Sequence, residues 1–198
     1  MSTFHIICAG PSAQPWINKV EWCNKSVVLC NGTPLIFNRQ TKDTRWVMID
    51  DIPEALKYWT LGLNDAVKYC TDINKHDVLG GYVIKHNVSY VSDNPLVSGF
   101  FWQGSVGNLA CHLAQWLGAT KCYVWGLDYQ DKTRSYSHIH DSLKSETNKW
   151  KNMDNIEVGW QKTRTGLHDL GCEIYNCNPN SVLQALEIVD PDKAAKED

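Results

Sequence analysis

Glycines and short polar side chains follow several apolar segments of this chain, at positions where they could hold a ligand. They are Gly10, Pro11 and Ser12 after residues 4–8, Asn31 after residues 27–30, and Gly126, Asp128 and Tyr129 after residues 122–125. A glycine lets backbone N–H groups approach a phosphate, and an asparagine amide offers donors and an acceptor to a base or ribose. These residue types therefore indicate a nucleotide-binding site.

The first two of these motifs also have a plainer interpretation. Gly10 and Pro11 could form an ordinary tight turn, because proline fixes its own φ. Asn31 and Gly32 form a dipeptide that is common in turns. For both motifs the sequence alone leaves the choice between turn and ligand contact open.

A long polar segment follows Asp128 and covers residues 129–152 approximately. A loop of this length inside a compact domain is typical of an active-site lid or a disordered segment. It contains Tyr136, His138 and His140. Histidine is suited to act as a general base near neutral pH, so either histidine is a candidate. The two could also ligate a metal ion, but a third ligand is not evident.

Asp50 and Asp51 are a second candidate for metal binding. They directly precede a predicted helix over residues 54–70. Acidic residues at the start of a helix commonly cap its free N–H groups and complement its dipole. Capping is therefore the favoured interpretation, and no tightly bound metal is expected.

The segment from Gly104 to Tyr129 is the best-defined structural unit in the sequence. It opens with the small residues 104–107 and continues with apolar residues at three- and four-residue spacing, which predicts a helix that ends at Gly118. The apolar run over residues 122–125 predicts a strand covered on both faces. Ser105 and Gly107 at the helix start join the candidate nucleotide-binding residues.

Strands and helices alternate along the rest of the chain. We expect strands at 4–8, 27–30, 46–49, 78–84 and 172–177, helices at 13–24, 54–70, 153–170 and from 182, and a loop at 38–44. This alternation predicts an α/β fold, a Rossmann-like, mostly parallel sheet with helices on both faces. We expect one domain over residues 1–190, with a charged, frayed tail at 191–198.

Composition narrows the class of protein. The chain has 198 residues, 43% of them hydrophobic, and a formal net charge of -3, so it has no basic field for a nucleic-acid partner. The eight cysteines form no CxxC pair and are expected to be reduced core residues of a cytoplasmic protein. No signal peptide or membrane span is evident. Whether the chain forms a homo-oligomer stays open.

Taken together, the motifs resemble a known family. Their order is CAGPS after the first strand, LCNG after the second, a Ser-x-Gly helix ending in LG, then WGLDY, and YNCNPNSVL at the last strand. This order resembles the bacterial CMP-sialic acid-dependent sialyltransferases of glycosyltransferase family 42. It also resembles the wider group that includes motility-accessory-factor-type glycosyltransferases and archaeal hydroxymethyldihydropterin pyrophosphokinases. Residues 33–100 contribute little to the resemblance.

The resemblance implies a role for each matched position. The residues concerned are Gly10, Pro11 and Ser12 at the phosphate or sugar, Asn31 at the nucleoside, Ser105 and Gly107 at the cleft, Gly126 and Asp128 at the family's glycine and aspartate, and Asn180 and Ser181 near the nucleotide. The sialyltransferases carry a histidine base just before the penultimate helix, whereas residues 148–158 here contain none. His138 and His140 lie earlier, in the lid-like loop.

We therefore expect a glycosyltransferase that takes a nucleotide-sugar donor, with a CMP-sugar favoured, and transfers the glycosyl group to an acceptor hydroxyl. The expected catalytic residues are Asp128, Tyr129, Tyr136, His138 and His140. Two alternatives stay open. One is Mg²⁺-dependent phosphoryl transfer of the pyrophosphokinase type, with Asp128 and the Asp50–Asp51 pair on the metal. The other is a non-catalytic protein that sequesters a nucleotide.

Overall fold

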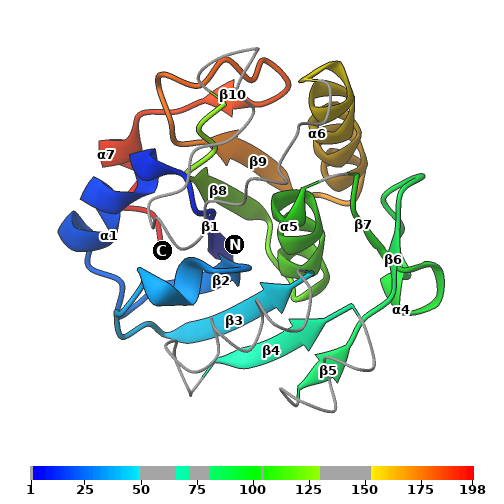
Figure 1. Ribbon diagram of the computed structural model, residues 1–198, viewed down its shortest axis with the longest axis horizontal. Coiled ribbons are helices and arrows are strands. Elements are labelled where there is room, and N and C mark those ends of the chain that lie inside the picture. Colours follow the sequence, from blue (N-terminus) through cyan, green and yellow to red (C-terminus); the bar gives the residue numbers. More distant parts are fainter. Residues whose placement is uncertain (1, 50–65, 72–80, 104, 130–152) are drawn as a thin grey trace.

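A parallel sheet organises the computed structural model, which describes residues 2–49, 66–71, 81–103, 105–129 and 153–198 (Figure 1). The strands are β1 (Thr3–Ile7), β2 (Ser26–Cys30), β3 (Asp43–Met48), β4 (Val67–Cys70), β5 (Tyr82–Val83), β8 (Lys121–Trp125), β9 (Glu173–Asn176) and β10 (Glu187–Ile188), with β6 (His86–Asn87) and β7 (Phe100–Phe101) as a separate pair. The large sheet has the order β10-β9-β8-β1-β2-β3-β4-β5, and its neighbouring strands all run parallel.

Helices cover both faces of this sheet. They are η1 (Pro11–Ala13), α1 (Gln14–Lys19), η2 (Thr33–Leu35), α4 (Pro95–Ser98), α5 (Val106–Trp116), α6 (Met153–Asp169) and α7 (Pro191–Ala194). Figure 1 shows α5 and α6 on one side of the sheet, with α1 and α7 on the other. The expected α/β architecture is thus confirmed.

The central strands are apolar at consecutive positions because each face packs against its own core. Ile6 and Val28 belong to the core beneath α5 and α6. Ile7 and Leu29 belong to the core beneath α1. All four side chains are fully buried. This two-sided burial is what continuous apolar runs in parallel strands predict.

Strand order reverses between β1 and β8. The strands that follow β1 in sequence, β2 to β5, extend to one side of it, whereas β8 to β10 extend to the other. The next helices of the described part after β1 and β8, α1 and α6, lie on opposite faces of the sheet. In open α/β sheets a crevice forms at such a point, and ligands bind there.

The two long helices agree closely with the sequence patterns. α5 ends at Trp116, and Gly118 has the left-handed φ of +98° expected at a helix C-terminus. α6 spans Met153–Asp169, within one residue of the predicted helix.

Two predicted helices are wrong where the structure describes them. Residues 67–70 form β4 rather than the end of a helix over 54–70, because they pair with β3 and β5; residues 54–65 lie outside the described part. No helix begins at Val182. The Glu157 carboxylate accepts hydrogen bonds from the N–H groups of Gln184 and Ala185, and a bend at Ala185 and Leu186 leads into β10.

Several boundaries also differ. α1 stops at Lys19, short of the expected residue 24, and Val20 is already extended. β3 begins at Asp43 inside the expected loop 38–44, because its first residues pair with β2. Of the predicted strand 78–84, residues 78–80 lie outside the described part, and Tyr82–Val83 form β5.

The charged tail is ordered, so its predicted fraying is wrong. α7 starts at Asp190, whose side chain accepts from the N–H of Asp192. Beyond α7, the ammonium of Lys25, a side chain only 4% exposed, donates to the Glu197 carbonyl and to the Asp198 carboxylate. Lys121 also pairs with Glu197. These contacts fasten the tail to the amino-terminal ends of β2 and β8.

All eight cysteines have free thiols, and Cys23 is the exposed one. This agrees with reduced core cysteines. Within the described part of the chain, no helix is both long and apolar enough to cross a bilayer.

Candidate functional site

Two glycines let the loops after β1 and β8 approach each other closely. A Cβ on Gly10 would lie 2.3 Å from the Gly126 carbonyl oxygen and 2.6 Å from Asp128 Oδ2. Gly126 has a φ of +78°, and its Cβ would lie 2.4 Å from the Cys8 carbonyl oxygen. Both contacts are too short for any side chain. The predicted glycines therefore meet at the point where the strand order reverses.

The Asp128 carboxylate ties three loops together. Its Oδ2 accepts a 2.6 Å hydrogen bond from the backbone N–H of Ser12, and its Oδ1 accepts a 2.5 Å hydrogen bond from Asn178 Nδ2. The side chain is 6% exposed, and burial raises the pKa of Asp128 while the hydrogen bonds from Ser12 and Asn178 oppose that rise. With one donor on each oxygen, Asp128 positions the loops after β1, β8 and β9.

Asn178 is a site residue that sequence reasoning does not identify. It is 1% exposed, and its Oδ1 accepts from the N–H of Asn180. Its own N–H donates to Asn176 Oδ1, and the Ser181 hydroxyl accepts from the N–H of Leu183. The sequence does carry one signal for Asn178, its position directly after the predicted strand 172–177. Asn31 is identified by the same signal, since it follows the predicted strand 27–30.

Asn31 follows β2 in a left-handed conformation, with φ of 47°. Its Oδ1 accepts from the N–H of Ile49, and its carbonyl oxygen accepts from Trp46 Nε1. It is therefore a turn residue that links the ends of β2 and β3. Among the described residues, its amide Nδ2 makes no hydrogen bond. The turn and ligand-contact interpretations are thus compatible.

The start of α5 lies against the end of β1. Ser105 caps the helix, since its Oγ accepts from the N–H of Gly107. A Cβ on Gly107 would lie 3.0 Å from the Trp160 ring and 3.3 Å from Cys8 Sγ. Glycine thus allows α5, α6 and β1 to pack closely at the carboxyl edge of the sheet.

Tyr129 is buried under this helix start, at 4% exposure. Burial raises the pKa of Tyr129 to about 12, although the neighbouring Trp160 and Ser105 side chains act in the opposite direction. The phenol therefore stays neutral at physiological pH. It can donate or accept a hydrogen bond through Ser105, but it cannot serve as a phenolate base.

Two amide side chains beside this packing have buried atoms without a partner among the described residues. Asn108 on α5 is fully buried, and neither its Oδ1 nor its Nδ2 is hydrogen-bonded to a described residue; the same holds for Gln103 Oε1. A buried polar group without a partner costs about 1–3 kcal/mol. A Cβ on Gly159 would come within 2.9 Å of the Gln103 carbonyl oxygen and 3.3 Å of Asn108 Nδ2. This polar spot lies between α5 and α6.

The described residues include part of the predicted site. Ser12, Asn31, Ser105 and Asp128 lie along the carboxyl edge of the sheet, as expected. Tyr136, His138, His140 and the Asp50–Asp51 pair lie outside the described residues. Within the ranges that are described, no group of three or more His, Cys, Asp or Glu side chains could hold a metal ion.

The chain matches no protein-family model and no curated protein sequence. Solved structures do share its fold. Sialyltransferase CstII from Campylobacter jejuni with cytidine-5'-monophosphate has a TM-score of 0.57 at 14% identity, over 97% of this chain and 86% of that one. CST-II with a trisaccharide acceptor and CMP has a TM-score of 0.57 at 12% identity, over 94% and 86%.

A third structure extends the fold likeness beyond CstII. The monofunctional alpha-2,3-sialyltransferase Cst-I from Campylobacter jejuni has a TM-score of 0.56 at 13% identity, over 94% of this chain and 79% of that one. At these identities the similarity establishes a shared fold along almost the whole chain.

Proposed function

We propose that this protein binds a nucleotide-activated sugar, with a CMP-sugar favoured, and transfers the glycosyl group to an acceptor hydroxyl. One observation carries the proposal. Gly10, Ser12, Gly126 and Asp128 meet where the strand order reverses, in a fold shared with sialyltransferases that were solved with CMP.

In this proposal the leaving phosphate binds between the loop after β1 and the start of α5. Gly10 and Gly107 let the loop and the helix pack closely there, and the N-terminus of α5 favours negative charge. Ser12 and Ser105 contribute hydroxyl groups, and Tyr129 supports Ser105 as a neutral hydrogen-bond partner. Preorganised donors of this kind stabilise the charge that develops on a leaving group.

The nucleoside lies towards the ends of β2 and β9. Asn31 Nδ2 is the proposed donor on one side. Asn180 and Ser181 belong to the loop that Asn178 shapes on the other.

The transfer step needs a base. The acceptor oxygen attacks the anomeric carbon, the bond from that carbon to the phosphate oxygen breaks, and the nucleotide leaves with the electron pair. The acceptor proton passes to His138 or His140, with Tyr136 assisting at the phosphate. A histidine near its ordinary pKa can take this proton at neutral pH.

Release of CMP from CMP-N-acetylneuraminic acid, followed by chromatography, tests the function. The purified protein should release CMP in the presence of chelator, and addition of lactose should accelerate the release. The double variant His138→Ala, His140→Ala should lose release and still bind CMP. Unchanged release would remove both histidines from the mechanism, and release that requires Mg²⁺ would favour phosphoryl-transfer chemistry.

A further inference from the structure

Two thiols lie side by side at the carboxyl ends of β1 and β2. The Sγ atom of Cys8 lies 3.9 Å from the Sγ atom of Cys30. Cys30 is the last residue of β2, and Cys8 directly follows β1. The register of the two strands pairs Ile7 with Leu29, so Cys8 and Cys30 are the next pair along them. The pairing of β1 with β2 therefore holds the two thiols next to each other.

The backbone at these two positions is compatible with a disulfide. Neighbouring strands lie about 4.7–4.9 Å apart, and the Cα atoms of most disulfides are about 4.4–6.8 Å apart. Cys8 and Cys30 belong to the same core beneath α5, so their side chains leave the sheet on the same face. An S–S bond is about 2.05 Å long, so the two sulfur atoms would have to approach each other by about 2 Å.

The pair joins the two loops that carry proposed nucleotide contacts. Cys8 directly precedes the loop that contains Ser12, and Cys30 directly precedes Asn31. The sulfur of Cys8 also lies at the start of α5, where a Cβ on Gly107 would be 3.3 Å from it. A bond between the two sulfur atoms would change this contact and link the loops after β1 and β2 covalently.

A second pair of thiols has the same spacing at a different place in the sheet. Cys122 Sγ lies 3.8 Å from Cys172 Sγ. Cys122 is the second residue of β8, and Cys172 directly precedes β9, so this pair lies near the amino-terminal ends of the strands. Both residues are 0% exposed, whereas Cys8 is 8% exposed and Cys30 is 2% exposed. The two pairs therefore differ in access from solvent and not in sulfur–sulfur distance.

We propose that Cys8 and Cys30 form a reversible disulfide that controls nucleotide binding in the crevice. A peroxide is the oxidant, and a dithiol is the reductant that restores the thiols. The effect on nucleotide binding rests on the proposed function. Formation of the bond is independent of it, because the bond requires only the two thiols and the oxidant.

Cys8 is the thiol that reacts first, because it is the more exposed of the two. Burial raises the pKa of the Cys30 thiol, which disfavours the reactive thiolate there. The Cys8 sulfur attacks one peroxide oxygen, the O–O bond breaks, and one water molecule leaves a sulfenic acid on Cys8. The Cys30 sulfur then attacks the Cys8 sulfur, and the S–O bond breaks to release a second water molecule. Two thiols are oxidised by two electrons in total, and one peroxide is reduced.

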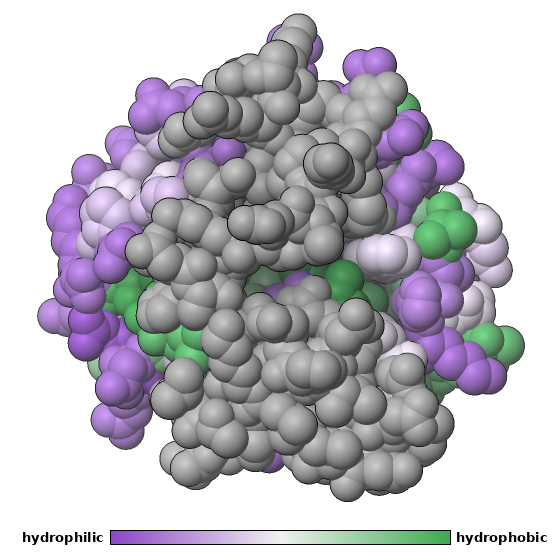
Figure 2. All heavy atoms as spheres, viewed as in Figure 1, coloured by the Kyte–Doolittle hydropathy of each residue, from purple (hydrophilic) through white to green (hydrophobic). Residues whose placement is uncertain are grey.

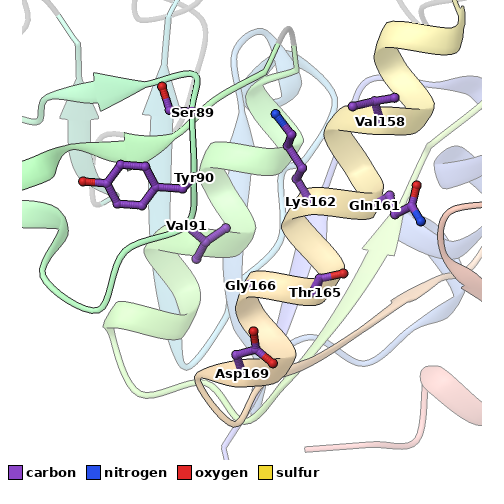
Figure 3. A pocket seen from close by; sticks show the side chains of 9 residues that line it. All are labelled: Ser89, Tyr90, Val91, Val158, Gln161, Lys162, Thr165, Gly166 and Asp169. Atoms are coloured by element: carbon purple, nitrogen blue, oxygen red, sulfur yellow. The ribbon is translucent and has the colours of Figure 1, made fainter.

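Cys23 is the exposed thiol that competes for peroxide. The groove along α6, whose lining includes Lys162 and Asp169, contains no cysteine (Figure 3). Figure 2 shows hydrophobic residues at the margin of the molecule where β6 and α4 lie, interspersed with hydrophilic ones. The exposed apolar side chains of α4 are Leu96 and Val97, and all eight thiols lie elsewhere. The variant Cys23→Ser therefore removes the competing surface thiol.

Hydrogen peroxide treatment of the Cys23→Ser variant tests formation of the bond. After denaturation and alkylation of the free thiols, peptide mass mapping should find the Cys8–Cys30 disulfide, while Cys122 and Cys172 should be alkylated. Dithiothreitol should restore both oxidised thiols. Absence of the Cys8–Cys30 disulfide, or equal oxidation of the Cys122–Cys172 pair, would overturn the inference.

Calorimetric titration with CMP before and after oxidation tests the control of binding. Oxidation should weaken CMP binding by about fivefold or more, as is typical of coupling between two sites, and dithiothreitol should reverse the change. Cys8→Ser and Cys30→Ser, each in the Cys23→Ser background, cannot form the bond, so peroxide should leave their CMP affinity unchanged. An effect of peroxide that persists in both variants would contradict control by this disulfide.

The two measurements separate this inference from the proposed function. A reduced protein that binds no CMP but still forms the Cys8–Cys30 disulfide contradicts the proposed donor site and not the bond. A reduced protein that binds CMP with the same affinity after the bond has formed contradicts the control of binding and leaves the donor site in place.

Discussion

The backbone N–H of Ser12 donates a 2.6 Å hydrogen bond to Asp128 Oδ2, although the two residues are 116 positions apart in the chain. The bond joins the loops after β1 and β8, whose strands are neighbours in the sheet. Asn178, in the loop after β9, donates a hydrogen bond to the other carboxylate oxygen of Asp128. The geometry of the crevice therefore depends on one buried carboxylate.

Asp128→Asn should destabilise the protein. An asparagine has one acceptor oxygen and an NH₂ group, so it cannot accept from both Ser12 and Asn178, and one buried donor is left unpaired. Losing a hydrogen bond to a charged group costs about 1.5–3 kcal/mol. Urea denaturation measures the change. Asp192→Asn, at an exposed ion pair with Lys19, is the matched control and should stay within about 0.5 kcal/mol of wild type. Equal effects of the two variants would mean that Asp128 does not join the loops.

Gly126→Ala should be far more damaging than Gly118→Ala. Both glycines have positive φ, +78° and +98°, so both variants carry the left-handed penalty of about 1–2 kcal/mol. The added Cβ of Gly126→Ala also collides with the Cys8 carbonyl oxygen, whereas nothing lies within 4 Å of a Cβ at Gly118. Thermal unfolding measures the melting temperatures of both variants, and the difference between them is the effect of the collision. Similar melting temperatures would contradict the collision.

His5 should make stability depend on pH. It is fully buried, Trp125 Nε1 donates to its Nδ1, and its Nε2–H faces the Glu197 carbonyl. Burial, aided by the charge of Lys25, lowers the pKa of His5 to about 4. The unfolded chain therefore binds the extra proton first as the pH falls below about 6.5, and stability decreases down to about pH 4, by roughly 3 kcal/mol in total.

Urea denaturation between pH 7.5 and 4 measures this loss as the difference between wild type and His5→Asn, which has no titrating ring. His168→Asn serves as the control, since that side chain is 66% exposed. Parallel pH profiles of wild type and His5→Asn would contradict the assigned role of burial.

Thiol reactivity should distinguish Cys23 from the other cysteines. Cys23 is exposed, whereas burial raises the pKa of the Cys30, Cys111 and Cys177 thiols, which lowers their thiolate content. A disulfide reagent should titrate one thiol rapidly in the folded protein and all eight in guanidinium chloride. Cys23→Ser should abolish the rapid phase, and a rapid phase that survives this change would place another thiol at the surface.

Much of the fold could be predicted because its signals are local. Periodic apolar residues define α5 and α6, and consecutive apolar residues define β1, β2 and β8. Glycines and polar residues directly after those strands indicated the crevice. Because parallel strands have their carboxyl ends at one edge of the sheet, these glycines and polar residues were expected to lie close together.

The remaining features depend on tertiary contacts. Residues 67–70 suit a helix until β3 and β5 pair with them. Val182 to Leu186 forms no helix, and Glu157, distant in sequence, accepts hydrogen bonds from its backbone. The charged tail is ordered because Lys25 is buried against it. Asn178 could not be distinguished from a turn asparagine without knowing that it meets Asp128.

Calorimetric titration with CMP tests the central claim most directly. We predict that the protein binds CMP, and that Asn31→Ala weakens this binding about tenfold by removing an amide donor, as about 1.4 kcal/mol corresponds to a factor of ten. Asn24→Ala, an exposed asparagine near the opposite end of β2, should bind CMP as the wild type does. Absence of CMP binding, or binding that Asn31→Ala leaves unchanged, would contradict a nucleotide site at the carboxyl ends of these strands.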